Sequence, residues 1–198
     1  ANDEIGANSI EKGQKFLIYA IPRSTYYAKL AEGASKENPK DFSWAIKNNT
    51  LDYNWGGDLE AKGCWNLTCK VGRNFNNNYG VGEFYPYNDE PNFEMSQTLT
   101  GLQPGTYQLS AQLFEDAKKD VYLFGNTTKV CVKATDKSGG TGSTPMEEVA
   151  SLMKKDDNYG KVTVPVLVDK NGVLKLGLCG NCPAKTWIVF DNFQLQYI

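Results

Sequence analysis

The chain has 198 residues, of which 21 are basic and 23 acidic, so its formal charge is −2 and its pI is near 5.3. This charge provides no broad positive field for phosphates, and we therefore expect no nucleic-acid partner. No apolar run reaches the ~18 residues of a membrane-spanning helix, and a chain that is 40% hydrophobic and 22% charged has the composition of a folded globular protein.

Two residue counts restrict the function further. The chain has no histidine, which excludes Ser-His-Asp and Cys-His nucleophile systems and His-ligated zinc proteases, whereas carboxylate pairs remain available for glycoside hydrolysis. Eleven Tyr, nine Phe and four Trp make 12% of the chain aromatic. Because this is more ring surface than a small core requires, it indicates a surface on which a ligand stacks.

The first half of the chain is rich in loops. Residues 1–12 are polar and without period, so we expect a loose leader ahead of a single domain over residues 13–198. The apolar run at 16–21 predicts a short strand, and residues 24–34 predict a short helix. From residue 41 to 87 the chain is rich in Asn, Gly and aromatic residues, which indicates loop-dominated β structure with a surface suited to binding.

The second half alternates apolar and polar residues as half-buried strands do. The predicted strands lie at residues 93–99, 107–113, 121–124, 129–133, 162–168, 174–178 and 187–197. One helix interrupts them, because residues 144–147 have the spacing of a capping box and an apolar stripe follows to Met153. Many strands and few helices predict an all-β sandwich or jelly roll with one short inserted helix.

Several of these segments together resemble a known family. They are residues 93–99, 101–107, 145–148, 159–168, 172–177 and 187–197. In order and spacing they are similar to the galactose-binding-like jelly-roll domains, which look like carbohydrate-binding modules and accompany glycan-degrading enzymes of gut Bacteroidetes. The resemblance covers a little over half of the chain and supplies no site in residues 1–82. It implies a non-catalytic carbohydrate-binding or adhesion module of a secreted or surface protein.

Aromatic residues and amides gather in the loop-rich region. Sugars are recognised by flat ring faces for their C–H side and by planar amides or carboxylates for their hydroxyls. We therefore expect a glycan surface between residues 53 and 87, with Trp55 and Trp65 at least partly exposed and the amides of residues 76–78 nearby. The alternative is that these rings fill the ends of the sandwich. The candidate residues are Tyr53, Asn54, Trp55, Asp58, Trp65, Tyr79, Tyr85 and Tyr87.

Strand phase assigns three further residues to the interior. Trp44 and Trp187 each lie in a strand-like apolar run, so we expect both in the core. Counted by twos along residues 187–197, Asp191 also faces inward, where a carboxylate is costly unless it is hydrogen-bonded or metal-bound. Domains of the kind that the chain resembles often hold a structural Ca²⁺ through such an acid and backbone carbonyls. Asp191 is therefore expected to be buried and either to bind Ca²⁺ or to accept backbone hydrogen bonds.

The five cysteines leave three interpretations. Cys64, Cys69, Cys179 and Cys182 could form a four-thiolate zinc site, although their spacing is not that of a zinc ribbon. A redox pair at 179–182 is disfavoured because a predicted strand, and not a helix, follows it. Structural thiols or local disulfides fit best, and Cys131 between two valines is typical of a small strand residue.

Three functions follow as hypotheses. The first is a non-catalytic carbohydrate-binding module that works in the periplasm, at the outer cell surface or as a secreted protein. The chain shows no signal pattern at its start, and we expect a form from which an export signal has been removed. The second is a glycoside hydrolase, for which Glu83, Glu94 and Asp58 are the first carboxylates to consider. The third is a protein-binding adhesin or structural module.

Overall fold

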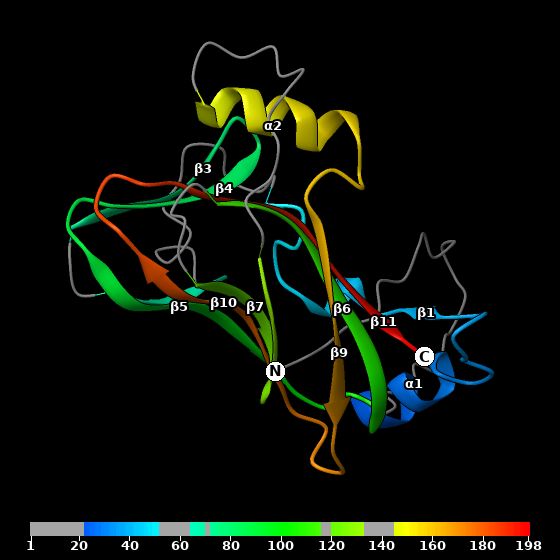
Figure 1. The fold of residues 1–198 in the computed structure, drawn as a ribbon. Helices are drawn as coiled ribbons and strands as arrows, with labels where there is room; N and C mark the ends of the chain where they lie inside the picture. Colours follow the sequence, from blue (N-terminus) through cyan, green and yellow to red (C-terminus); the bar gives the residue numbers. More distant parts are fainter. Residues whose placement is uncertain (1–21, 52–63, 70–71, 116–119, 133–144) are drawn as a thin grey trace, which may run out of the picture.

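The computed structural model describes residues 22–51, 64–69, 72–115, 120–132 and 145–198. These residues form two β-sheets that pack face to face, and a helix lies against the outside of one of them (Figure 1). Within the described residues all strand pairs are antiparallel. The prediction of an all-β sandwich is confirmed.

The strands divide between two sheets that we call sheet A and sheet B. Sheet A has the order β3-β4-β11-β6-β9, and β1 also pairs with β11. Its strands are β1 (Lys40–Asp41), β3 (Arg73–Asn78), β4 (Val81–Pro86), β6 (Gly105–Glu115), β9 (Lys161–Val168) and β11 (Ile188–Tyr197). Sheet B has the order β2-β5-β10-β7-β8. Its strands are β2 (Asn66–Thr68), β5 (Glu90–Leu99), β7 (Val121–Gly125), β8 (Thr128–Cys131) and β10 (Leu174–Cys182).

The described helices are α1 (Arg23–Leu30), the short 3₁₀ turn η1 (Ser43–Ala45) and α2 (Pro145–Lys155). Helix α2 is the inserted helix that the capping-box spacing predicts, and α1 overlaps the helix predicted at 24–34 but begins one residue earlier and ends four residues earlier. The seven predicted strands of the second half all form, as β5 to β11. The predicted leader at 1–12 and the predicted strand at 16–21 lie outside the described residues.

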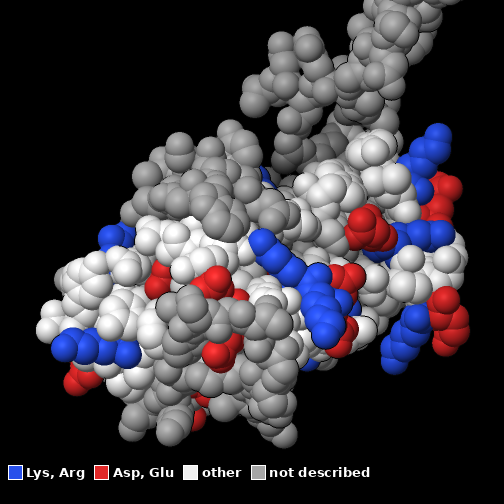
Figure 2. All heavy atoms as spheres, turned by 90° about the horizontal axis from the view of Figure 1, so that it is seen from above, with Lys and Arg blue, Asp and Glu red and all other residues white. Residues whose placement is uncertain are grey.

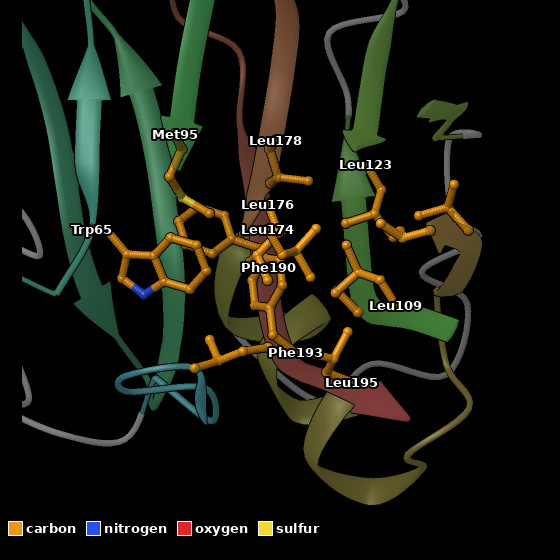
Figure 3. Close-up of a cluster of buried hydrophobic side chains, with 14 of the residues drawn as sticks. Trp65, Met95, Leu109, Leu123, Leu174, Leu176, Leu178, Phe190, Phe193 and Leu195 are labelled. Carbon is orange, nitrogen blue, oxygen red and sulfur yellow. The ribbon is translucent and has the colours of Figure 1, made fainter. Parts of the chain in front are cut away.

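The main core lies between the two sheets (Figure 3). Leu109, Phe190 and Leu195 contribute to it from sheet A, and Met95 and Leu176 from sheet B. Burying each such side chain contributes about 1.5–3 kcal/mol to folding. As predicted, the alternation of apolar and polar residues gives each sheet one apolar side, and these two sides form the core.

A second, smaller core lies on the outer side of sheet A, where α2 covers the sheet. Met146, Val149 and Met153 of the helix pack against Phe114 of β6 and Val189 of β11. The apolar stripe of α2 therefore faces the sheet, and its charged residues are left on the other side.

The buried side chain of Gln112 attaches the end of α2 to β6. Its Nε2 lies 3.1, 2.9 and 3.1 Å from the carbonyl oxygens of Met153, Asp156 and Tyr159. The last carbonyls of a helix have no partner within it, so a buried helix end needs donors of this kind. Gln112 thereby holds α2 in place on the outside of sheet A.

The central strand β11 contains a β-bulge. Asp191 pairs with Gln112, and Gln194 pairs with Ser110, so β11 has two residues where β6 has one. Asn192 takes a positive φ of 50°, and its N–H donates to Asp191 Oδ1 at 2.7 Å. An extra residue of this kind shifts the alternation of the strand by one position.

The bulge changes which residues of β11 face the core. Ile188 and Phe190 face inward before it, and Phe193 faces inward after it. Val189 therefore belongs to the outer side of sheet A, and Asp191, two residues further along the same stretch, shares that side. The prediction that Asp191 shares the inward phase of Phe193 is wrong, because counting by twos cannot allow for an inserted residue.

We expect the backbone conformation of Asn192 to be important for stability. Asn192→Val should lower the free energy of unfolding by about 1–2 kcal/mol, because a β-branched residue is strained at positive φ. Asn192→Gly should cost less than half as much, because glycine adopts this conformation without strain. Urea denaturation of the two variants measures the difference. Equal losses in both would contradict this role of the bulge.

Candidate functional site

The structure separates the candidate residues into three groups. Tyr53, Asn54, Trp55 and Asp58 lie outside the described residues. Trp65 lies in the core. Tyr79, Tyr85 and Tyr87 lie on or beside the hairpin of β3 and β4.

Trp65 is only 1% exposed, so the expectation that it would be at least partly exposed is wrong. It precedes β2 in the same phase as the buried Leu67, and its ring centroid lies 4.8 Å from that of Phe193 (Figure 3). Its Nε1 has no hydrogen-bond partner among the described residues. For this residue the alternative holds: the ring fills the sandwich and offers no face to a ligand.

The prediction that Trp44 lies in the core is also wrong, because its side chain is 48% exposed. The η1 turn interrupts what looks in the sequence like a strand, and it turns the indole outward. The ring stacks on Phe42 at 5.8 Å and lies 6.2 Å from Tyr26, while Nε1 donates to the carbonyl of Asp41 at 3.1 Å. Trp44 is thus a fixed, exposed ring beside α1.

The hairpin of β3 and β4 presents amides and aromatic rings on the outer side of sheet A. Phe75 and Phe84 occupy the inward positions of the two strands. The residues that alternate with these two along the strands point outward. Among them, Asn74 is paired with Tyr85 and Asn76 with Glu83. Alternation alone therefore places polar and aromatic groups in adjacent rows.

Three rings meet at the end of this hairpin away from its turn. The centroids of Tyr85 and Trp187 lie 5.4 Å apart at an interplanar angle of 37°, and those of Tyr85 and Tyr87 lie 6.1 Å apart at 69°. Tyr87 is 49% exposed, and the other two rings are half-buried. Tyr79 is exposed at the turn of the hairpin, so the structure does not bring it together with Tyr87.

Trp187 is the member of this group that sequence reasoning missed. It was expected in the core, but it lies half-buried on the outer side of sheet A, against the second core. Its place follows from the bulge, which leaves the start of β11 in the opposite phase to its end. The signal in the sequence is that Trp187 and Val189 are two residues apart and so share one side of the strand. Which side this is can be assigned only when the bulge is known.

Amides and one carboxylate surround the rings. Tyr87 Oη donates to Asn74 Oδ1 at 2.6 Å. Trp187 Nε1 donates to Glu83 Oε1 at 3.1 Å, and Asn78 Nδ2 donates to Glu83 Oε2 at 2.7 Å. We call the set that these contacts join the aromatic–amide surface: Asn74, Asn78, Glu83, Tyr85, Tyr87 and Trp187. Flat rings beside planar hydrogen-bonding groups can bind a ligand that has both C–H faces and hydroxyls.

Asp191 is buried, as predicted, with 8% of its surface exposed. Its Oδ1 accepts the N–H of Asn192, which is a backbone hydrogen bond of the expected kind. No three Cys, Asp or Glu side chains of the described residues gather in a group that could hold a metal ion. Calcium binding at Asp191 stays a prediction.

The four cysteines proposed as a zinc site do not come together. Cys64 and Cys69 flank β2, whereas Cys179 and Cys182 lie on β10, and β5 runs between these two strands. Burial raises the pKa of the Cys179 thiol above its usual range, although Lys129 opposes the shift. A thiol of this kind is a poor nucleophile at neutral pH.

The carboxylates considered for hydrolysis also lie apart. Glu83 is on the outer side of sheet A, whereas Glu94 is on the outer side of sheet B, where its Oε1 pairs with Lys175 Nζ at 2.6 Å. Both sheets and the core lie between the two carboxylates, and stacked sheets alone are about 10 Å apart. Glu83 and Glu94 therefore cannot act on one glycosidic bond, which needs carboxylates roughly 5 to 10 Å apart. Asp58 lies outside the described residues.

On the face of the molecule seen from above α2 (Figure 2), the described residues show no patch of one charge sign that would indicate a site. In the described part of that face, Lys and Arg side chains lie among Asp and Glu side chains (Figure 2). Among the described residues, no helix has the length and hydropathy that a membrane crossing requires.

Comparison with known proteins shows similarity in fold. No family model matches the sequence, and no curated protein matches it. A solved structure titled "CBM4 structure and function", where CBM denotes a carbohydrate-binding module, matches with a TM-score of 0.50 and 11% identity over 77% of this chain and 99% of that chain. At this identity the match shows the fold, a β-sandwich jelly roll.

Two further structures match with lower scores. TmCBM61 in complex with beta-1,4-galactotriose has a TM-score of 0.49 and 15% identity over 78% of this chain and 98% of that chain. The Stig cyclase Fisc from Fischerella sp. TAU has a TM-score of 0.44 and 15% identity over 76% of this chain and 94% of that chain.

Chelation tests the calcium prediction at Asp191. If Ca²⁺ is bound, EDTA should lower the melting temperature, because a ligand held only by the folded state stabilises it. Asp191→Asn should then abolish the difference between melting with and without EDTA. Unchanged melting in EDTA, with no metal found by elemental analysis, would reject calcium and leave the hydrogen-bonded carboxylate.

Proposed function

We propose that this protein is a non-catalytic carbohydrate-binding module that holds a glycan on the aromatic–amide surface. The observation that carries the proposal is the contact of three rings, Tyr85, Tyr87 and Trp187, with amides and a carboxylate at their border. The fold shared with a CBM4 structure supports it, because that fold serves carbohydrate binding in the named protein.

The rings would bind the C–H face of a sugar. Tyr87 is the most exposed of the three, and Tyr85 lies between it and Trp187, so the three rings form a continuous strip. Stacking on an aromatic ring removes apolar surface of both partners from water. Such aromatic anchors commonly dominate the energy of an interface.

The amides would bind the hydroxyls. Asn74 accepts a hydrogen bond from Tyr87 through Oδ1, so its Nδ2 is left to donate to a ligand. Asn78 donates through Nδ2 to Glu83, so its Oδ1 is left to accept from a ligand. A sugar hydroxyl both donates and accepts, and it can therefore pair with either residue.

The internal hydrogen bonds would also prepare the surface for binding. Tyr87 and Trp187 both form a hydrogen bond and a ring contact within the protein before any ligand arrives. Side chains that are already ordered lose little entropy on binding. This function places the protein where polysaccharides are found, and we propose an exported or cell-surface location of the kind that the family resemblance implies.

Binding measurements on single variants test the proposal. Tyr87→Ala and Trp187→Ala should each weaken glycan binding by about 1–3 kcal/mol, because each removes a stacking ring. The matched control is Trp44→Ala, which removes an equally exposed ring beside α1, at the other end of the molecule (Figure 1). A glycan array identifies a ligand, and calorimetry then measures the affinity of each variant.

Stability measurements separate loss of binding from loss of folding. Tyr87→Ala should change the free energy of unfolding by less than about 0.5 kcal/mol, whereas Trp65→Ala should cost about 3–5 kcal/mol. Weaker binding in Trp44→Ala alone would move the site to α1. Failure of the wild type to bind any glycan would favour a protein-binding adhesin, and release of dye from chromogenic glycosides would favour a hydrolase.

A further inference from the structure

The carboxylate of Glu83 is buried, and its partners among the described residues are neutral. The residue is only 4% exposed, and its two oxygens accept from Trp187 Nε1 and Asn78 Nδ2. No Lys or Arg of the described part of the chain forms an ion pair with it. Removing a carboxylate from water is costly, and two neutral donors offset only part of that cost. Because burying this charge is costly, we expect Glu83 to have a function besides packing.

The position of Glu83 relates it directly to the aromatic–amide surface. Both of its hydrogen-bond donors are members of that surface, and its neighbours in the register are Asn76 on one side and Val189 on the other. Arg73, the cation of β3, lies two residues from the inward Phe75 and shares its side, so it belongs to the opposite side of the sheet from Glu83. The negative charge of Glu83 therefore lies beneath neutral rings and amides.

A ligand on this surface would experience that charge with less screening than the charge of an exposed carboxylate. Water and salt weaken the interaction between exposed charges, but they weaken it much less for a charge that the protein covers. Two like charges about 6 Å apart at an effective dielectric constant of about 40 repel by about 1.4 kcal/mol, which is a tenfold change in affinity.

We infer that Glu83 makes the aromatic–amide surface select neutral glycans over acidic ones. The inference rests on the proposed function and adds the substrate class: chains of uncharged sugars are accepted, and chains that carry uronate or sulfate groups are disfavoured. Glu83 acts here through charge, because both of its oxygens are occupied by protein donors. It is a specificity-determining residue that does not itself contact the ligand.

Matched pairs of polysaccharides test this inference. The pairs are polygalacturonic acid and its carboxyl-reduced form, glucuronoxylan and unsubstituted xylan, and carboxymethylcellulose and hydroxyethylcellulose. Within any pair that binds, the wild type should prefer the neutral member by about tenfold. Glu83→Gln, which is isosteric and uncharged, should reduce this ratio to about threefold or less. The control Glu94→Gln makes the same change of net charge on the outer side of sheet B and should leave the ratio unchanged.

A second measurement covers the case in which Glu83→Gln fails to fold, which thermal melting and the tryptophan fluorescence of the variant would reveal. Raising the salt concentration to about 0.5 M should then reduce, without abolishing, the preference of the wild type for the neutral member, because the acidic group of the ligand is exposed to solvent although Glu83 is covered. Equal or tighter binding of the acidic members, or a ratio that neither Glu83→Gln nor salt changes, would overturn the inference and leave the proposed function standing. Absence of binding to both members of every pair, and to all other glycans of an array, would reject both.

Discussion

The bulge in β11 determines how the two sides of sheet A are used. One inserted residue lets the same strand give Phe190 and Phe193 to the main core and Val189 to the second core under α2. The bulge is itself held in place, because the N–H of Phe193 donates to the carbonyl of Asn49 at 2.8 Å and Asn49 Nδ2 donates back to the Phe193 carbonyl at 3.3 Å. Without the shift in phase, either the core or the outer side of the strand would lose its apolar residues.

The candidate site depends on the same shift. Trp187 reaches Tyr85 only because the start of β11 faces outward, beside β4. Glu83 then connects three strands through two hydrogen bonds, since its donors come from β3 and from the segment that leads into β11. The aromatic–amide surface is thus assembled from side chains that are distant in sequence, and its order before binding comes from contacts within the sheet.

Periodicity predicted the second half of the fold because those strands have one apolar and one polar side, which is the pattern that sequence shows most directly. It failed where a single residue breaks the period. Counting by twos assigns Asp191 and Trp187 to the inward side, which is wrong because the bulge at Asn192 adds a position. Trp44 lies in what looks like an apolar strand, but the η1 turn interrupts it and turns the ring outward. Trp65 is an error in the other direction, because a ring predicted to be exposed in a loop-rich region lies in the core. It directly precedes the short strand β2, which the sequence does not reveal.

The central claim, that Trp187 belongs to a ligand surface and Trp65 to the core, can be measured directly. In a protein labelled with ¹⁵N at tryptophan, the indole N–H resonances of the four Trp residues are assigned by single Trp→Phe variants. Titration with a glycan that binds should move the Trp187 resonance and leave that of Trp65 in place. A shift at Trp65 or Trp44 with no change at Trp187 would contradict the account.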